Sequence, residues 1–188
     1  MNLMNLTGNY GMTTIVVLSW LSFYFILVVW IFLYRYFTLN SMIQREKKNV
    51  ECLLKGKNIV LRESTFNLNG IDRKKSESLL QYFLNKTIKE ATMGLTFLGI
   101  VASTAPFIGL FGTVVEILEA FSKLGMESKA TLDVIAPIIS KALIATAAGI
   151  LTAIPAYTFN LFLKRKVFEL NTYLQLQVNL LAYSKDKE

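Results

Sequence analysis

The sequence predicts an all-α membrane protein with three transmembrane helices, and two observations lead to this prediction. Of the 188 residues, 53% are hydrophobic, and they concentrate in long stretches that lack any charged side chain. These uncharged stretches are residues 12–34, 91–115 and 142–163. About 20 predominantly apolar residues form a helix long enough to cross the hydrocarbon core of a bilayer. Three uncharged helices of this kind would be unusual inside a soluble protein of this size, so we expect each of them to span a membrane.

The distribution of basic residues predicts how the chain is oriented in the membrane. Residues 35–90 contain 12 Lys or Arg against 6 Asp or Glu, and residues 164–188 contain 5 against 3. The connection at 119–133 contains 2 against 3. Because loops rich in Lys and Arg stay in the cytoplasm, we expect the N-terminus outside, the long loop inside, the short connection outside and the C-terminus inside. The basic excess is thus a topology signal, and we expect no nucleic-acid partner.

The spans and their connections divide the chain into segments. We predict, in order, a periplasmic N-terminal tail at 1–11, a transmembrane helix at 12–34, a cytoplasmic helical loop at 35–90, a second transmembrane helix at 91–118, a short periplasmic loop at 119–133, a third transmembrane helix at 134–163 and a cytoplasmic C-terminal helix at 164–188.

The second and third transmembrane helices are expected to extend into the cytoplasm. Residues 72–91 run into the second span without a helix breaker, whereas residues 55–58 and 66–70 have the composition of a break and a turn. After the third span, apolar residues recur at three- and four-residue spacing, which is typical of an amphipathic helix. They are Val167, Leu170, Leu174, Val178 and Leu181. This stripe predicts a helix that packs either on its own chain or against another subunit.

The later two spans differ from the first in the size of their side chains. The first span is bulky and aromatic, as expected of a helix that faces membrane lipid. The other two place small residues along one side, and this lets helix backbones approach closely in lipid. We assign helix packing and kinks to Pro106, Gly109, Gly112, Gly149 and Pro155. Plain packing within one chain is a sufficient account of most of these small residues.

Packing does not explain four polar residues of the same two spans. Thr113 and Glu116 share a helix face, since residues three apart are neighbours on a helix surface. For Glu116 and Lys141 we consider two interpretations. Either both side chains lie at headgroup level and extend into water, or they meet as a charge pair at the outer mouth of a polar path. Thr113 and Thr146 would then line that path one turn deeper.

Two stretches within these spans give a family resemblance. APFIGLFGTV, residues 105–114, and IAPIISKALIATAAGILTAIPAYTFN, residues 135–160, resemble the TolQ/ExbB branch of the MotA/TolQ/ExbB proton-channel family. The match covers both later spans, and the predicted topology fits that branch. The resemblance implies that the functional threonines of the family fall on Thr113 and Thr146.

The resemblance also implies an assembly and an activity. It implies a homopentamer in the bacterial inner membrane, whose second and third helices surround a pore that holds a dimer of single-span ExbD- or TolR-type partners. Protons driven by the membrane potential would pass by way of an aspartate on that partner and energise TonB or TolA. The motifs are common to TolQ and ExbB, so both roles remain open.

The sequence departs from the family pattern at two charged positions. Lys141 stands where the family has a glutamate, and Glu116 stands where it commonly has a glycine. We hypothesise a charge swap, in which the acid has moved to the second helix and holds the lysine of the third.

Other classes of protein fit the sequence less well. With no histidine and one cysteine, a histidine base and the usual zinc sites are not expected. There is no phosphate-binding loop of the form G-x-x-x-x-G-K-[ST], and no aspartate lies within a span. We therefore expect no enzyme, no cofactor and no metal site. The alternatives are a structural membrane scaffold without ion conduction and a MotA-like flagellar stator subunit, for which four spans are expected.

Overall fold

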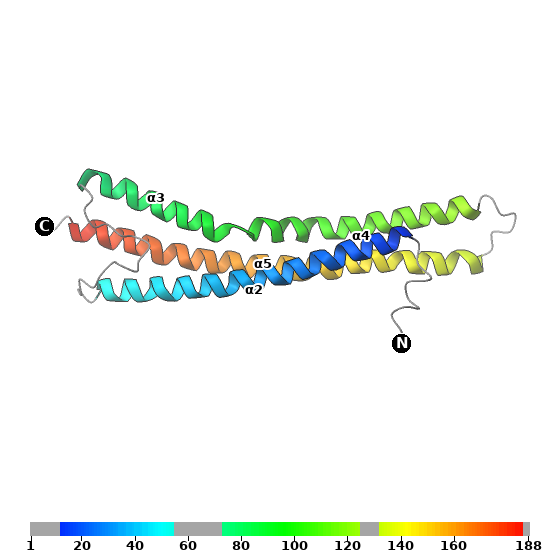
Figure 1. Cartoon of the computed structure of the whole chain (residues 1–188), viewed down its shortest axis with the longest axis horizontal. Coiled ribbons are helices and arrows are strands. Elements are labelled where there is room, and N and C mark those ends of the chain that lie inside the picture. Colours follow the sequence, from blue (N-terminus) through cyan, green and yellow to red (C-terminus); the bar gives the residue numbers. More distant parts are fainter. Residues whose placement is uncertain (1–11, 55–72, 125–131, 186–188) are drawn as a thin grey trace. The chain divides into compact units, whose positions relative to one another are not determined.

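The computed structural model of the chain describes residues 12–54, 73–124 and 132–185 (Figure 1). Four helices account for these ranges: α2 (Met12–Leu54), α3 (Arg73–Thr92), α4 (Leu95–Leu124) and α5 (Leu132–Lys185). The described residues contain no strand. The all-helical prediction is therefore confirmed for this part of the chain.

Three stretches of helix are long and apolar enough to cross a membrane. They are Met12–Leu54, Ser78–Ser122 and Ala136–Leu180, and each overlaps one predicted span. The predicted tail at 1–11, the break at 55–58 and the turn at 66–70 lie outside the described residues, as do residues 125–131 of the predicted short loop.

The joint between α3 and α4 differs from the expected continuous helix. The two helices are separated by a turn at Met93 and Gly94, so the expectation that residues 72–91 continue as one helix through the second span is wrong. Gly94 has a φ of 87°, which glycine adopts without the steric cost that a side chain brings. The carbonyl oxygen of Glu90, freed at this helix end, accepts hydrogen bonds from Met93 N at 3.3 Å and from Arg35 Nη1 of α2 at 3.2 Å.

The third long helix, in contrast, is continuous. α5 runs for 54 residues and contains both Pro137 and Pro155. The extension of this helix beyond its span is therefore confirmed. Proline removes one backbone hydrogen bond from a helix, and at these two positions the helix continues through it.

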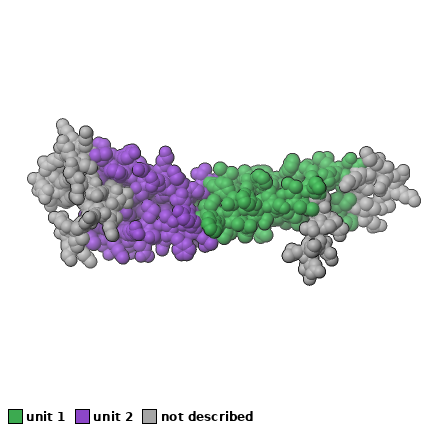
Figure 2. Space-filling view, in the orientation of Figure 1, with its two compact units in different colours: residues 1–31, 97–160 green, residues 32–96, 161–188 purple. Residues whose placement is uncertain are grey.

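The first of two compact units comprises residues 1–31 and 97–160, shown in green in Figure 2. In its core α2, α4 and α5 pack together. The buried cluster consists of Leu21 and Val28 of α2, Val101 and Ala105 of α4, and Ala153 and Ala156 of α5. Because the α5 residues in this cluster are alanines, α5 can lie close to its neighbours.

The second unit comprises residues 32–96 and 161–188, shown in purple in Figure 2. Large aliphatic side chains fill its core: Leu39, Ile43 and Val50 of α2, Leu80 and Leu84 of α3, and Leu170, Leu174 and Val178 of α5. The predicted apolar stripe of α5 is thus buried within its own chain at Val167, Leu170, Leu174 and Val178. Leu181 lies outside the residues whose side chains are described.

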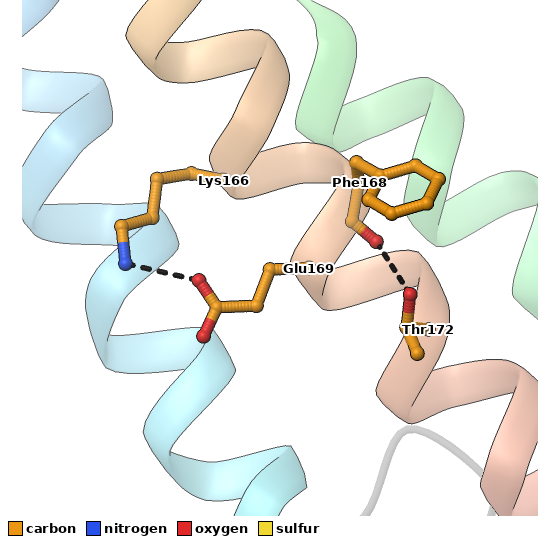
Figure 3. A network of polar contacts seen from close by, with 4 residues as sticks. All are labelled: Lys166, Phe168, Glu169 and Thr172. Atoms are coloured by element: carbon orange, nitrogen blue, oxygen red, sulfur yellow. Dashed lines mark hydrogen bonds and ion pairs between the residues drawn. The ribbon is translucent and has the colours of Figure 1, made fainter.

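Polar side chains on the surface of α5 make local contacts in this second unit. Lys166 Nζ lies 3.0 Å from Glu169 Oε2, and Thr172 Oγ1 donates a hydrogen bond of 3.1 Å to the carbonyl oxygen of Phe168 (Figure 3). Ion pairs as exposed as this one contribute little to stability. This exposed ion pair therefore adds little to the stability that the apolar core gives the second unit.

Candidate functional site

In the first unit, α4 and α5 touch backbone to backbone; we call this contact the α4–α5 seam. A Cβ atom added to Gly109 would lie 2.6 Å from the carbonyl oxygen of Ala145, and one added to Gly149 would lie 2.6 Å from that of Ala105. Real Cβ atoms essentially never approach another heavy atom this closely. Both positions therefore need glycine for the helices to pack as they do.

A third glycine lies where α2 joins the seam. A Cβ atom on Gly112 would lie 3.1 Å from Val17 Cγ1 of α2 and 3.2 Å from Ala145 Cβ of α5. These neighbours are side-chain atoms, which can shift more readily than a backbone carbonyl. Gly112 thus has less room than an ordinary helical residue, although the restriction is weaker than at Gly109.

The two predicted proline positions lie inside helices. Pro106 is within α4 and Pro155 is within α5, and both are partly buried. Because proline has no N–H, the carbonyl oxygens of Ala102 and Leu151 lose their helical hydrogen bonds. The kinks assigned to these prolines remain predictions.

Thr113 of α4 and Thr146 of α5 meet in the seam. Their Oγ1 atoms are 2.5 Å apart, and Thr113 is only 6% exposed. Thr113 Oγ1 also lies 3.2 Å from the carbonyl oxygens of Gly109 and of Ala142. The glycine at position 109 lets α5 approach this turn of α4, so the packing of the seam brings the two hydroxyl groups together.

The hydroxyl pair has two hydrogen-bonded arrangements. Each threonine hydroxyl has one donor hydrogen and can accept hydrogen bonds from others. When Thr113 donates to a carbonyl oxygen, Thr146 can donate to Thr113; in the reverse arrangement Thr113 donates to Thr146. A pair of this kind can pass a proton along while each oxygen keeps one hydrogen of its own.

Glu116 lies on the buried face of α4, one turn after Thr113. It is 6% exposed, and its Oε2 atom has no hydrogen-bond partner in the described structure. Lys141 on α5 is partly exposed, as is Glu119 one turn further along α4. The burial of Glu116 argues against a carboxylate that extends into water. Its pairing with Lys141 remains a prediction.

Several buried polar side chains were not predicted from the sequence. Gln177 of α5 is fully buried, and its Nε2 donates hydrogen bonds to Glu46 Oε2 at 2.8 Å and to the Glu46 carbonyl oxygen at 3.2 Å. Asn49 Nδ2 donates to the same Oε2 at 3.1 Å. Gln177 precedes Val178 of the apolar stripe, and this placement could have indicated a buried amide.

In the described ranges, no group of three His, Cys, Asp or Glu side chains is positioned to hold a metal ion. The polar groups of the seam are hydroxyls, carbonyl oxygens and one carboxyl. This arrangement can exchange protons by hydrogen bonding, and it supplies no strong nucleophile or metal ligand set.

Three membrane-length helices with a buried hydroxyl pair between two of them define a multi-pass membrane protein with a polar contact inside its small-residue seam. The chain belongs to the MotA/TolQ/ExbB proton channel family, which it matches over residues 46–176. The matched region contains both threonines, Glu116 and Lys141.

Individual relatives place the chain in the TolQ/ExbB branch, as the resemblance indicated. A biopolymer transport protein of Helicobacter pylori, described as ExbB-like, is 50% identical over 177 residues, which is 93% of this chain and 94% of the relative. The Tol-Pal system protein TolQ of Haemophilus influenzae is 49% identical over 39% of this chain and 32% of its own length. The biopolymer transport protein ExbB of Xanthomonas campestris is 47% identical over 38% of this chain and 28% of its own length.

Proposed function

We propose that this protein is the proton-conducting subunit of a motor in the bacterial inner membrane, and that it is not an enzyme. The N-terminus and the short connection would face the periplasm, and the basic segments would face the cytoplasm. Family membership supports the activity, and the buried hydroxyl pair of Thr113 and Thr146 is the observation that carries it. Packing of α4 against α5 would not by itself require two hydroxyl groups in contact.

The working unit in this proposal is an assembly. Five copies would place α4 and α5 around a central pore, which holds a dimer of a single-span ExbD- or TolR-type partner. The names of the relatives, a biopolymer transport protein and a Tol-Pal system protein, support a role in transport or in a Tol-Pal system. The energised protein in this proposal is TonB or TolA. Work at the outer membrane would then be import across it, or envelope integrity and constriction.

The α2 helix has the surface expected of the side that faces lipid in such an assembly. Trp20 is 53% exposed and Trp30 is 72% exposed, and Phe23 lies exposed between them. Aromatic side chains of this kind are common at the lipid-facing surface and interfaces of membrane proteins. Their placement on α2 is consistent with α4 and α5 as the helices nearer the pore.

In the proposed mechanism, the partner's aspartate carries the proton through most of the pore. Thr113 and Thr146 stabilise the proton in transit by hydrogen bonds, as hydroxyl and carbonyl groups do in narrow conduction paths. Movement of the partner carboxyl into and out of reach of this pair would couple proton flow to rotation or rearrangement of the complex.

A scaffold without ion conduction is the competing function, because close glycine contacts would serve a purely structural seam as well. A MotA-like stator subunit is a further alternative. The described residues contain three membrane-length helices, whereas four spans are expected of a stator subunit.

Proton flux into liposomes tests the proposal. The purified chain is reconstituted with its ExbD- or TolR-type partner, and wild type is compared with Thr113→Ala and Thr146→Val. Thr158→Val is the matched control, because Thr158 is exposed on α5 and its hydroxyl donates a hydrogen bond within its own helix, to the carbonyl oxygen of Ile154. We expect partner-dependent flux in wild type and control, and flux near the level of protein-free liposomes in both seam variants.

Two outcomes would count against the proposal. Flux that is unchanged in Thr113→Ala and Thr146→Val would remove the role of the hydroxyl pair and leave helix packing as its explanation. A complex that assembles with its partner but conducts no protons under an imposed membrane potential would favour the scaffold.

A further inference from the structure

The buried face of α4 carries an acidic side chain that the mechanism above does not use. Glu116 is 6% exposed, and its Oε2 has no hydrogen-bond partner. A carboxyl group removed from water is costly unless it is hydrogen-bonded or paired. Acidic residues inside membrane spans therefore usually mark a polar path or a binding partner.

We propose that Glu116 is a proton-carrying group of the conduction path, next to the Thr113–Thr146 hydroxyl pair. The inference rests on the proposed function and extends it in one respect. A carboxyl group of this chain, in addition to that of the partner subunit, takes up and releases the conducted proton.

The position of Glu116 on α4 supports this role. Residues three apart on a helix have Cβ atoms about 5–6 Å apart on the same face, so Glu116 and Thr113 are neighbours on α4. No hydrogen bond joins the two side chains in the described structure, and in the proposed path one water bridges them. Thr113 is also buried, and it already contacts Thr146 Oγ1. With that bridging water, the carboxyl group and the two hydroxyl groups would form a series of exchangeable groups from α4 to α5.

The transfer balances without any other reactant. A proton from water binds the Glu116 carboxylate and makes the neutral acid. The acid then gives its proton through the bridging water to Thr113 Oγ1 while Thr113 passes its own hydrogen to Thr146 Oγ1, and Thr146 passes its hydrogen to the next acceptor, the partner's carboxylate. Each threonine ends with one hydrogen, Glu116 is a carboxylate again, and rotation of the two hydroxyls resets the path.

Charged residues also flank Glu116 on the two helices. α4 carries Glu119 and Lys123, and the first ten residues of α5 carry Asp133 and Lys141. Glu119 and Lys141 are partly exposed. α2 has no Asp, Glu, Lys or Arg among residues 12–34.

A permanent ion pair between Glu116 and Lys141 is the alternative role for the carboxyl, and it makes the opposite prediction. A carboxylate held by a lysine keeps its charge and carries no protons. If the two form an ion pair, removal of both charges would restore conduction. If Glu116 is a proton carrier, removal of Lys141 as well would not restore the conduction that is lost with Glu116.

The first test is partner-dependent proton flux in liposomes for five variants with matched geometry. Glu116→Gln keeps the shape and removes the exchangeable proton, and Glu116→Asp keeps the carboxyl. Glu119→Gln is the control for the loss of an acid on the same helix. Lys141→Met and the double variant Glu116→Gln/Lys141→Met separate a carrier from an ion pair.

We expect Glu116→Gln to lose flux as completely as Thr113→Ala, Glu116→Asp to retain part of it, and Glu119→Gln to behave as wild type. The double variant should stay as inactive as Glu116→Gln. Recovery of flux in the double variant, or normal flux in Glu116→Gln, overturns the inference. If wild type conducts and Thr113→Ala does not, the proposed function stands even when the inference about Glu116 fails.

A second measurement does not depend on conduction. Infrared spectra of the reconstituted complex are recorded through a pH titration, and each variant is first checked for assembly with its partner. The difference between the wild-type and Glu116→Gln titrations should contain a carboxylic-acid C=O band that changes with pH, and Glu119→Gln should retain the band at that frequency. Titration spectra that are identical in wild type and Glu116→Gln would overturn the inference, including the case in which no variant conducts.

Discussion

The two units of the chain bury their helices with different kinds of side chain. In the first unit, Gly109 and Gly149 let α4 and α5 touch through backbone atoms. In the second unit, leucine, isoleucine and valine side chains fill the space between helices. Lipid is as apolar as leucine, so close backbone contact replaces hydrophobic burial as the cause of association in a membrane. In water, burial of large apolar side chains is the dominant favourable contribution.

The buried acidic side chains of the two units also differ in the hydrogen bonds that they accept. In the second unit, Glu46 Oε2 accepts hydrogen bonds from Gln177 and Asn49. In the first unit, Glu116 Oε2 accepts none. A buried carboxyl group that accepts hydrogen bonds from amides stabilises one arrangement of its helices. A carboxyl oxygen without a hydrogen-bond partner is available for proton exchange.

The largest loss of stability on substitution is expected in the second unit. Leu174→Ala removes a fully buried side chain, and we expect it to lower the free energy of unfolding by about 2–5 kcal/mol. Leu176→Ala, at a 43% exposed position on the same helix, should have little effect. Thermal unfolding of the purified complex in detergent measures both variants. An equal loss at the two positions would contradict the assignment of this core.

An intermediate effect is expected in the seam. Gly109→Ala would place a Cβ atom 2.6 Å from a backbone carbonyl oxygen, so we expect a destabilisation of about 1–3 kcal/mol as α4 and α5 separate. Proton flux should fall with it, because the two threonine hydroxyls would separate as well.

Gly99→Ala is the control for this substitution. Its Cβ atom would lie 3.1 Å from Asn160 Nδ2, a side-chain atom that can move aside. Both variants are compared by thermal unfolding in detergent. If Gly99→Ala were as damaging as Gly109→Ala, the backbone contact would not be the cause.

The smallest effect is expected at the surface of the second unit. Lys166→Met removes an ion pair whose partners are 30% and 41% exposed, so stability should change by about 0–1 kcal/mol. Chemical denaturation at low and high salt measures this difference, which salt should reduce further. A loss comparable to that of Leu174→Ala would show that charge contributes to this unit as strongly as its apolar core.

The three long helices could be predicted from the sequence, because a long apolar stretch without charged residues is compatible with few structures other than a membrane-spanning helix. The stripe from Val167 to Val178 also indicated its buried face correctly. The break at Gly94 could not be predicted with the same means, because a single glycine is tolerated within a helix or ends one, depending on its tertiary contacts. Here Arg35, distant in sequence, donates to the freed carbonyl of Glu90.

The candidate site could be predicted in part. Spacing placed Thr113 and Glu116 on one face, and the family resemblance singled out Thr146. The contact between the two threonines depends on how closely α4 approaches α5, and this distance follows from the glycines of both helices together. No sequence pattern indicated that Oε2 of Glu116 would lack a hydrogen-bond partner.

The aromatic surface of α2 has a consequence for optical experiments. The chain has two tryptophans, Trp20 and Trp30, and both are exposed on this helix. Intrinsic fluorescence therefore reports the surroundings of α2, and the seam between α4 and α5 contributes no tryptophan emission. Quenching by brominated lipid would measure how much of α2 is covered by neighbouring subunits. Assembly can therefore be followed without attaching a dye.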